Sequence, residues 1–183
     1  MMPENEREFS RIVRIDRETG PGDDAVTFSV EANEDERAAL ARRFGLLGLD
    51  ALSATGRIEV MARGRRARLT ATLKADATQV CVVSLEPVHS AIEEQFSVTY
   101  DSDAARVSGT PEQDFDVNDE DPPDPLSEDG IDVGKAVAEH LGLALDPYPR
   151  APGVTLDGAG GGGNGPGAGV TSPFSVLGRF KDR

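Results

Sequence analysis

The sequence predicts a single α+β domain, built from a mainly antiparallel β-sheet with two packing helices, an acidic loop and a flexible C-terminal tail. Three observations predict this fold. Residues 55–100 alternate apolar and polar side chains with a period of two, which is the period of a strand. Residues 33–44 and 132–145 carry apolar side chains at helical spacing. The gaps between the predicted strands are too short for the long crossovers that parallel strands need.

The N-terminal third is expected to supply two strands and a helix. Residues 9–16 (FSRIVRID) and 25–32 (AVTFSVEA) alternate apolar and polar side chains, so each is predicted to form a strand. Asn33 is a good N-cap and Glu36, three residues later, matches a capping box, so a helix is expected to begin there. The apolar face of this helix is predicted to consist of Leu40, Phe44 and Leu47.

The main sheet is expected in residues 55–100. Gly45 and Gly48 break the helical pattern, and a short, separate apolar piece follows them up to Leu52. The alternating pattern then predicts three strand segments and a last strand in sequence order: residues 55–62, 67–75, 78–87 (TQVCVVSLEP, a buried continuation) and 88–100.

A second helix is predicted over residues 132–145. Asp132 is placed to cap it, and Pro147 and Pro149 are placed to stop it. Its apolar side chains recur every four residues, at Val133, Val137, Leu141 and Leu145. The sheet and both helices therefore account for one hydrophobic core.

The remaining segments set the expected domain boundaries. Residues 1–8 are predicted to be a flexible N-terminus, and residues 9–153 to form the domain, with the acidic loop at 101–130. Residues 154–171 are rich in glycine and are predicted to be a linker. Residues 172–183 are apolar again and form a C-terminal motif.

Charge is distributed unevenly along the chain. The net charge is −14, and residues 101–183 contribute 6 basic and 16 acidic side chains, a net charge of −10. No Lys or Arg occurs from residue 107 to residue 134, whereas ten carboxylates do. Such a segment attracts basic partners and repels phosphate backbones at long range. We predict that four of its residues capture basic partners: Asp119, Glu120, Asp121 and Asp124.

Composition also favours a cytoplasmic location. Cys81 is the single cysteine, so an intramolecular disulfide is excluded, as is usual in a reducing compartment. The N-terminus lacks the apolar stretch of a signal peptide, and no run approaches the ~20 apolar residues of a membrane span. No contact with a membrane is expected.

Candidate catalytic and metal-binding residues are few. Cys81 and His89 are the nearest nucleophile and base in sequence, but Cys81 lies in an apolar run where a thiol usually serves as a small hydrophobe. One cysteine and two histidines, the second being His140, fall short of a zinc ligand set. The glycine run lacks the ending of a phosphate loop. We therefore expect no catalytic residue, no metal and no cofactor.

Basic residues gather on two of the predicted strands and their turn. Arginine on a sheet surface can bind RNA phosphates, although no aromatic side chains interleave here as they do in single-strand binders. The alternative is a solvated face or a pairing with the acidic loop of the same chain. The candidate RNA or partner contacts are Arg57, Arg63, Arg65, Arg66, Arg68 and Lys74.

Three ordered segments resemble the YceD family, the large ribosomal RNA subunit accumulation proteins, and most closely its alphaproteobacterial members. They are CVVSLEPVHSAIEEQFSVTYD (81–101), EDGIDVGKAVAEHLGLALDPYPRAPG (128–153) and SPFSVLGRFK (172–181). The resemblance implies a non-enzymatic role in 23S rRNA accumulation or processing and in large-subunit biogenesis. Many relatives carry Cys-x-x-Cys where this chain has Cys81-Val82-Val83-Ser84, so a metal or redox role of that motif is not expected here.

The leading functional hypothesis is a ribosome assembly factor that binds ribosomal proteins, pre-ribosomal large-subunit particles or both. In it the acidic loop captures basic partners, and the C-terminal motif docks through Phe174, Val176, Leu177 and Phe180. A second hypothesis is direct binding of 23S rRNA through the sheet face from Arg57 to Lys74. A third is a thiol enzyme that uses Cys81.

Overall fold

The computed structural model describes residues 9–15, 25–62, 64–104 and 122–154. The predicted flexible N-terminus (1–8), the glycine-rich linker and the C-terminal motif lie outside the described residues, as does most of the acidic loop. The elements in chain order are β1 (Ile12–Val13), β2 (Val26–Glu31), α1 (Glu34–Phe44), β3 (Gly48–Met61), β4 (Arg66–Val80), β5 (Pro87–Asp101), β6 (Asp124–Pro125), β7 (Ile131–Asp132) and α3 (Val133–Ala144).

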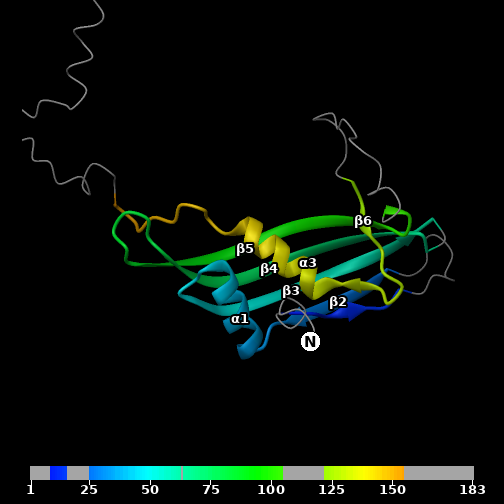
Figure 1. Ribbon diagram of the computed structural model, residues 1–183, viewed down its shortest axis with the longest axis horizontal. Helices are drawn as coiled ribbons and strands as arrows, with labels where there is room; N and C mark the ends of the chain where they lie inside the picture. The colour runs from blue at the N-terminus through cyan, green and yellow to red at the C-terminus, as the bar shows by residue number, and fades with distance from the viewer. Residues whose placement is uncertain (1–8, 16–24, 63, 105–121, 155–183) are drawn as a thin grey trace, which may run out of the picture.

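A five-stranded sheet forms the body of the domain, with strand order β2-β3-β4-β5-β6. Neighbouring strands are antiparallel, except that the short β6 pairs in parallel with the end of β5. Both helices lie over the same face of the sheet, α1 against β3 and α3 against β4 and β5 (Figure 1). The predicted fold class is confirmed.

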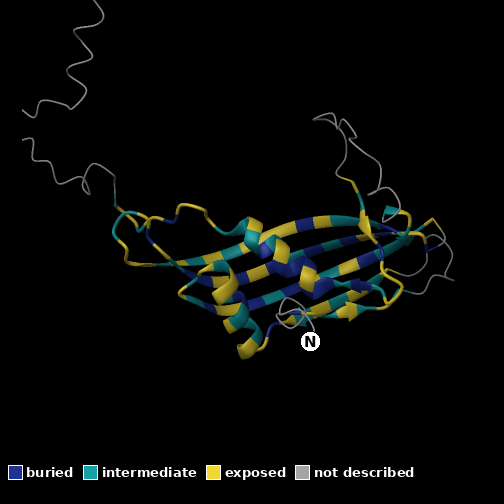
Figure 2. Ribbon diagram, viewed as in Figure 1, coloured by how far each residue is buried: buried dark blue, intermediate teal, exposed yellow. Residues whose placement is uncertain are grey.

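The core lies between this covered face and the helices. Along β4 every second residue from Ala67 to Ala77 is buried, and Figure 2 shows the alternation of buried and exposed positions along the long strands. Leu69 and Leu73 are completely buried in the middle of β4. The intervening alanines are small, which allows the helices to approach the sheet. The other elements contribute seven large side chains that are at most 1% exposed: Leu40, Leu52, Ile58, Ile131, Val133, Val137 and Leu141.

Strand β3 is longer than the sequence predicted, and the predicted strand 78–87 is wrong beyond Val80. The apolar piece after Gly48 is the first part of β3, because its backbone pairs with β4 from Gly48 onward through a register shift between Leu49 and Ala51. The expected strand 78–87 ends at Val80, since residues 81–86 form the turn that leads into β5. The apolar side chains of residues 81–86 therefore belong to a turn and not to a buried strand.

Local chemistry explains where the helices begin and end. The Asn33 side chain accepts a hydrogen bond from the Glu36 N–H (2.9 Å), and the Glu36 carboxylate accepts one from the Asn33 N–H (2.8 Å), so the predicted capping box is confirmed. Gly45 ends α1 in the left-handed conformation, at φ 66°. Asp132 caps α3 by accepting from the Lys135 N–H (3.1 Å). The predicted apolar face of α1 is wrong at Leu47, which lies past this cap and is 56% exposed.

The N-terminal segment crosses the helices instead of joining the main sheet. Strand β1 contains only two residues and pairs with β7. Gly134 permits this crossing, because a Cβ at that position would lie 2.8 Å from the Phe9 carbonyl oxygen and 2.9 Å from the Arg11 nitrogen. The predicted first strand is thus much shorter than residues 9–16, and it belongs to a separate two-stranded sheet.

Candidate functional site

The face of the sheet opposite the helices is polar, and no helix of the described residues covers it. The strand register places Arg57 opposite Thr70, and Thr70 opposite Ser97, in one row across β3, β4 and β5. The next row contains Thr55, Thr72 and Gln95. The predicted basic residues Arg66, Arg68 and Lys74 share this face, since they alternate with the buried positions of β4.

Carboxylates neutralise much of this basic patch. Arg57 pairs with Glu59 at 3.0 Å, Arg66 with Asp101 at 2.5 Å, and Lys74 with Glu93 at 3.4 Å. Asp101 is nearly buried, and hydrogen bonds from the Asp103 N–H and from Arg66 hold its pKa below the ordinary value. Arg65 is exposed in the turn before β4, while Arg63 lies outside the described residues. The uncovered face therefore has a nearly balanced charge.

An open groove lies at the other side of the molecule, between β5, β6, β7 and the first turns of α3. Its volume is about 340 Å³. The parallel pairing of β6 with β5 sets Asp124 opposite Tyr100, and the turn before β7 adds Asp129. The remaining polar walls come from α3 and its cap: Asp132, Lys135 and Glu139. We call this feature the acidic groove.

The electrostatic potential of the acidic groove is negative. Burial raises the pKa of the Tyr100 hydroxyl, and the nearby carboxylates of Asp124, Glu139 and Asp132 raise it further. Lys135 offsets part of the charge through its ion pair with Glu139 at 3.7 Å. Apolar groups of Ile12, Tyr100 and Ile131 form the rest of the lining. A cationic side chain with an apolar stem matches this combination of walls.

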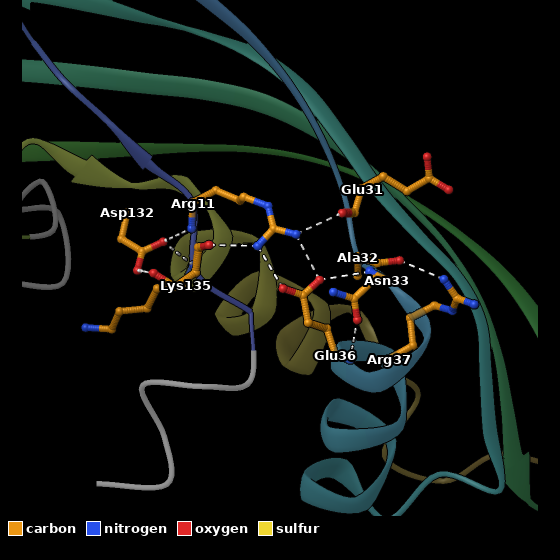
Figure 3. Close-up of polar contacts among 9 residues, drawn as sticks. Arg11, Glu31, Ala32, Asn33, Glu36, Arg37, Asp132 and Lys135 are labelled. Carbon is orange, nitrogen blue, oxygen red and sulfur yellow. Dashed lines mark hydrogen bonds and ion pairs between the residues drawn. The ribbon is translucent and has the colours of Figure 1, made fainter. Parts of the chain in front are cut away.

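A polar junction holds the N-terminal segment against both helices (Figure 3). Arg11 donates to both carboxylate oxygens of Glu36, at 2.7 and 2.9 Å, and its guanidinium lies 5.1 Å from the centre of the Phe9 ring. The Arg11 N–H and the Ser10 hydroxyl donate to Asp132, at 2.8 and 2.6 Å. Asp132 is thus occupied by structural contacts, and the exposed carboxylates of the groove are Asp124, Asp129 and Glu139, of which Glu139 pairs with Lys135.

Cys81 lies at the start of the β4–β5 turn, away from the acidic groove. The thiol is completely buried and accepts hydrogen bonds from the Ser84 and Ala151 N–H groups, both at 3.3 Å. Hydrogen bonds from the side chain and backbone of Ser84 and from the Ala151 backbone lower the pKa of the thiol to about 6. His89 instead contacts the Thr78 hydroxyl through Nδ1, at 2.8 Å. The Cys81 sulfur therefore ties the β4–β5 turn to the segment after α3.

The structure brings together only some of the residues singled out in the sequence. Asp124 lies in the acidic groove, but Asp119, Glu120 and Asp121 lie outside the described residues, as do Phe174, Val176, Leu177 and Phe180. Sequence reasoning missed Tyr100, Asp129 and Glu139 as groove residues. The run of carboxylates pointed to this region, but the contribution of β5 depends on the parallel pairing of β6, which has no local sequence signal.

A comparison with protein families identifies the family of this chain. The model of the family described as large ribosomal RNA subunit accumulation protein YceD matches residues 69–181, which is more than half of the chain. The chain belongs to the YceD family. No curated protein and no solved structure shows significant similarity to the chain. The YceD match covers β4, β5 and α3, and hence most of the acidic groove.

Three further observations concern the family and the described residues. YceD is not known as an enzyme family. Within the described residues, no three His, Cys, Asp or Glu side chains are arranged to hold a metal ion. No helix among those residues has the length and apolar character needed to cross a membrane.

Proposed function

We propose that this YceD protein is a non-enzymatic, cytoplasmic factor that supports 23S rRNA accumulation or processing and large-subunit assembly by binding basic segments of ribosomal proteins. The acidic groove is the observation that carries the proposal. Two of its exposed carboxylates, Asp124 and Asp129, stand beside the apolar surface of Tyr100. Ribosomal proteins that contact rRNA are rich in Lys and Arg, the side chains whose chemistry this site matches.

The geometry supports binding of one extended basic side chain at a time. The methylene stem of a Lys or Arg packs on Tyr100 and Ile12, and the ring face of Tyr100 adds attraction for the cation. The charged head then reaches Asp124 or Asp129. Contacts of this exposed kind are individually weak, so specificity requires several basic residues of the same partner.

The acidic loop adds further negative charge that attracts such a partner. Asp119, Glu120 and Asp121 precede β6 by a few residues along the chain, and they add three negative charges to the sequence next to the groove strand. Exposed charges act over about 8–10 Å at physiological salt, so they accelerate encounters more than they tighten contacts. In the proposed order of events, the acidic loop first captures the basic partner, and the partner then binds in the acidic groove.

Direct binding of 23S rRNA by the uncovered face is the alternative. Arg65 and Arg68 are exposed on the strands and turn that carry the basic patch, but three neighbouring cations already pair with carboxylates. A phosphate must compete with Glu59, Asp101 or Glu93 for the charge of those cations. This observation favours the protein-binding proposal, and sensitivity to RNase separates the two.

A pair of charge-neutralising variants tests the proposal. Asp124→Asn with Asp129→Asn removes two carboxylates from the acidic groove, and Glu59→Gln with Glu93→Gln removes two from the opposite face. Each variant and the wild type serve as bait in affinity purification from cells, with and without RNase. We expect large-subunit proteins to co-purify in both conditions, and to be lost from the groove variant alone.

Other outcomes would reject the proposal. Loss of all large-subunit proteins after RNase treatment would show that RNA mediates the association and would favour the uncovered face. Equal recovery with both double variants would show that the acidic groove binds no partner. The thiol enzyme hypothesis requires that Cys81→Ser abolish function, whereas the proposed role allows this variant to retain it.

A further inference from the structure

Exposed apolar side chains gather at the end of the sheet that carries the β4–β5 turn. Seven large apolar side chains are exposed among the described residues, and only Ile12 lies elsewhere, at the N-terminal end of α3. The others are Leu47, Val80, Val82, Leu85, Leu143 and Tyr148, which we call the apolar end. Leu85 and Leu143 are the most exposed, at 76% and 78%. A cluster of this kind on a small domain marks an interaction surface.

Backbone and side-chain hydrogen bonds hold the parts of the apolar end together. The Leu47 N–H donates to the Thr78 carbonyl (2.8 Å), and the Gln79 side chain donates to the Asp146 carbonyl (2.9 Å). The Val82 N–H donates to the Pro149 carbonyl (2.9 Å). These contacts hold the segment after α1, the β4–β5 turn and the segment after α3 side by side, with Val80 at the end of β4 and Leu143 in the last turn of α3.

The turn presents its leucine at a conformational cost. Leu85 has a φ of 63°, a left-handed conformation that leucine rarely adopts, and its N–H donates to the Cys81 carbonyl (3.0 Å). A polar residue such as Asn would be more stable there in water, because it tolerates this conformation and exposes no apolar surface. A strained and exposed leucine is consistent with a binding role for the turn.

We propose that the C-terminal motif of the same chain docks on the apolar end. The described part of the chain stops at Val154, next to this surface, since the Ala151 N–H donates to the buried Cys81 sulfur at the base of the turn. A glycine-rich stretch follows, and then the motif with Phe174, Val176, Leu177 and Phe180. The exposed apolar side chains of the described residues and the apolar motif are therefore joined by a glycine-rich tether.

The length of the tether favours this site over others. Nineteen residues lie between Val154 and Phe174. A glycine-rich chain of that length has a root-mean-square span of roughly 25 Å. Strand β5, with 15 residues, is roughly 50 Å long at the rise of an antiparallel strand. The motif therefore reaches the apolar end readily, whereas Ile12 and the acidic groove lie much farther along the molecule.

Tethering also makes a weak contact sufficient. A short flexible linker gives an effective concentration in the millimolar range. A contact whose dissociation constant between separate molecules is about 1 mM is then roughly half formed within one chain. The YceD match supports the motif as an integral part of the family unit, because it extends through residue 181 and does not stop at α3.

A single tryptophan tests the docking, since the chain contains none. Phe174→Trp in the full chain reports the environment of the motif through its emission wavelength, and Phe180→Trp is the second reporter in case the first position rejects the larger ring. We expect emission at shorter wavelength than that of the same protein in denaturant. The wavelength should not change when the protein is diluted 100-fold, because the contact lies within one molecule.

Surface variants then locate the contact. Leu85→Asn with Tyr148→Ser should shift the emission to that of an exposed tryptophan, and both residues are exposed enough for the fold to persist. Ile12→Asn is the matched control and should leave the emission unchanged. Emission typical of water in both reporters would overturn the proposal. A shift that disappears on dilution would assign the site to a second copy, and a shift that appears only with an added ribosomal protein would assign it to that partner.

Discussion

The two faces of the β2–β5 sheet use the same strands but differ in how they respond to charge. On the covered face, β4 contributes Leu69 and Leu73, both inaccessible to water, beneath the helices. On the uncovered face the same strand carries Arg68 and Lys74 among hydroxyl and amide side chains. Successive side chains of one strand thus face in opposite directions, one into the apolar core and the next into water.

This difference separates stability from recognition. The covered face holds the hydrophobic contacts that fold the domain, each completely buried Leu contributing roughly 1.5–3 kcal/mol. The uncovered face can change its charges without disturbing the core. The acidic groove and the apolar end both lie on the helix side or at the rim of the sheet, where secondary-structure elements meet and the core is incomplete.

The largest expected effect comes from placing a charge on the covered face. Leu69→Asp buries a carboxylate that has no partner among the surrounding core residues. The cost is roughly several kcal/mol of unfolding free energy, which should unfold a domain of ordinary stability. Ile92→Asp, on the same face of β5 but only partly buried, should destabilise less. Thermal and urea denaturation measure both effects.

A matched change on the uncovered face serves as the control. Ser97 is exposed on β5 and pairs across the sheet with Thr70, the residue next to Leu69. Ser97→Asp should alter the free energy of unfolding by about 0.5 kcal/mol or less. If Leu69→Asp melted like the wild type, or if Ser97→Asp unfolded the domain, the assignment of the two faces would be reversed.

The covered face was predictable from the sequence because burial repeats every second residue. The period of two in residues 67–75 specifies the side of β4 that faces the core, and helical spacing does the same for Val133, Val137 and Leu141. Element ends were less predictable. The apolar run after Val80 looked like a strand, but its Leu85 takes a left-handed turn conformation and stays in water.

The second prediction compares the ion pair between Arg11 and Glu36, beside the helices, with the exposed ion pair between Lys74 and Glu93 on the uncovered face. Arg11→Gln removes the two hydrogen bonds to Glu36 and leaves that carboxylate largely shielded from water. We expect a loss of about 1 kcal/mol in the free energy of unfolding. Lys74→Gln breaks the exposed pair with Glu93 and should cost about 0.5 kcal/mol or less.

Acid sharpens this comparison. Burial raises the pKa of Glu36, but hydrogen bonds from Arg11 and from the Asn33 N–H outweigh it, so the pKa lies below its ordinary value of 4.5. A carboxylate with a lowered pKa contributes stability above the ordinary value and loses that contribution as the pH falls through the lowered one. The difference between wild type and Arg11→Gln should therefore shrink in acid. If Arg11→Gln and Lys74→Gln lowered the free energy of unfolding equally at neutral pH, the two ion pairs would not differ in their contribution to stability.

The acidic groove was only partly predictable for a physical reason. Charge density along residues 107–134 is visible in the sequence, and it pointed to Asp124. The groove itself requires that β6 pair with the last residues of β5 and that the N-terminal segment cross α3 at Gly134. Both are long-range contacts between short segments, and neither has a repeating pattern that could reveal it.

The smallest expected effect concerns the two histidines, one on each side of the sheet. His140, on α3, stacks on Phe96 of the covered face with ring centres 4.0 Å apart and an angle of 13° between the rings. Burial lowers its pKa below the ordinary 6.5, although the carboxylates of Glu139, Glu94 and Asp124 oppose this. Below pH 6.5 the unfolded chain therefore takes up a proton more readily than the folded one. The free energy of unfolding should rise with pH from the lowered pKa up to about 6.5.

Replacing either histidine tests whether the rise in the free energy of unfolding with pH comes from His140, on the covered face. His140→Phe keeps an aromatic ring against Phe96 and removes the titrating group, so urea denaturation between pH 5 and pH 7 should show a flatter profile than the wild type. His89→Gln, which removes the histidine of the uncovered face, should keep the wild-type rise. If the rise survived in His140→Phe and vanished in His89→Gln, titration on the uncovered face would control stability. The separation of the two faces into a folding layer and a solvated layer would then be wrong.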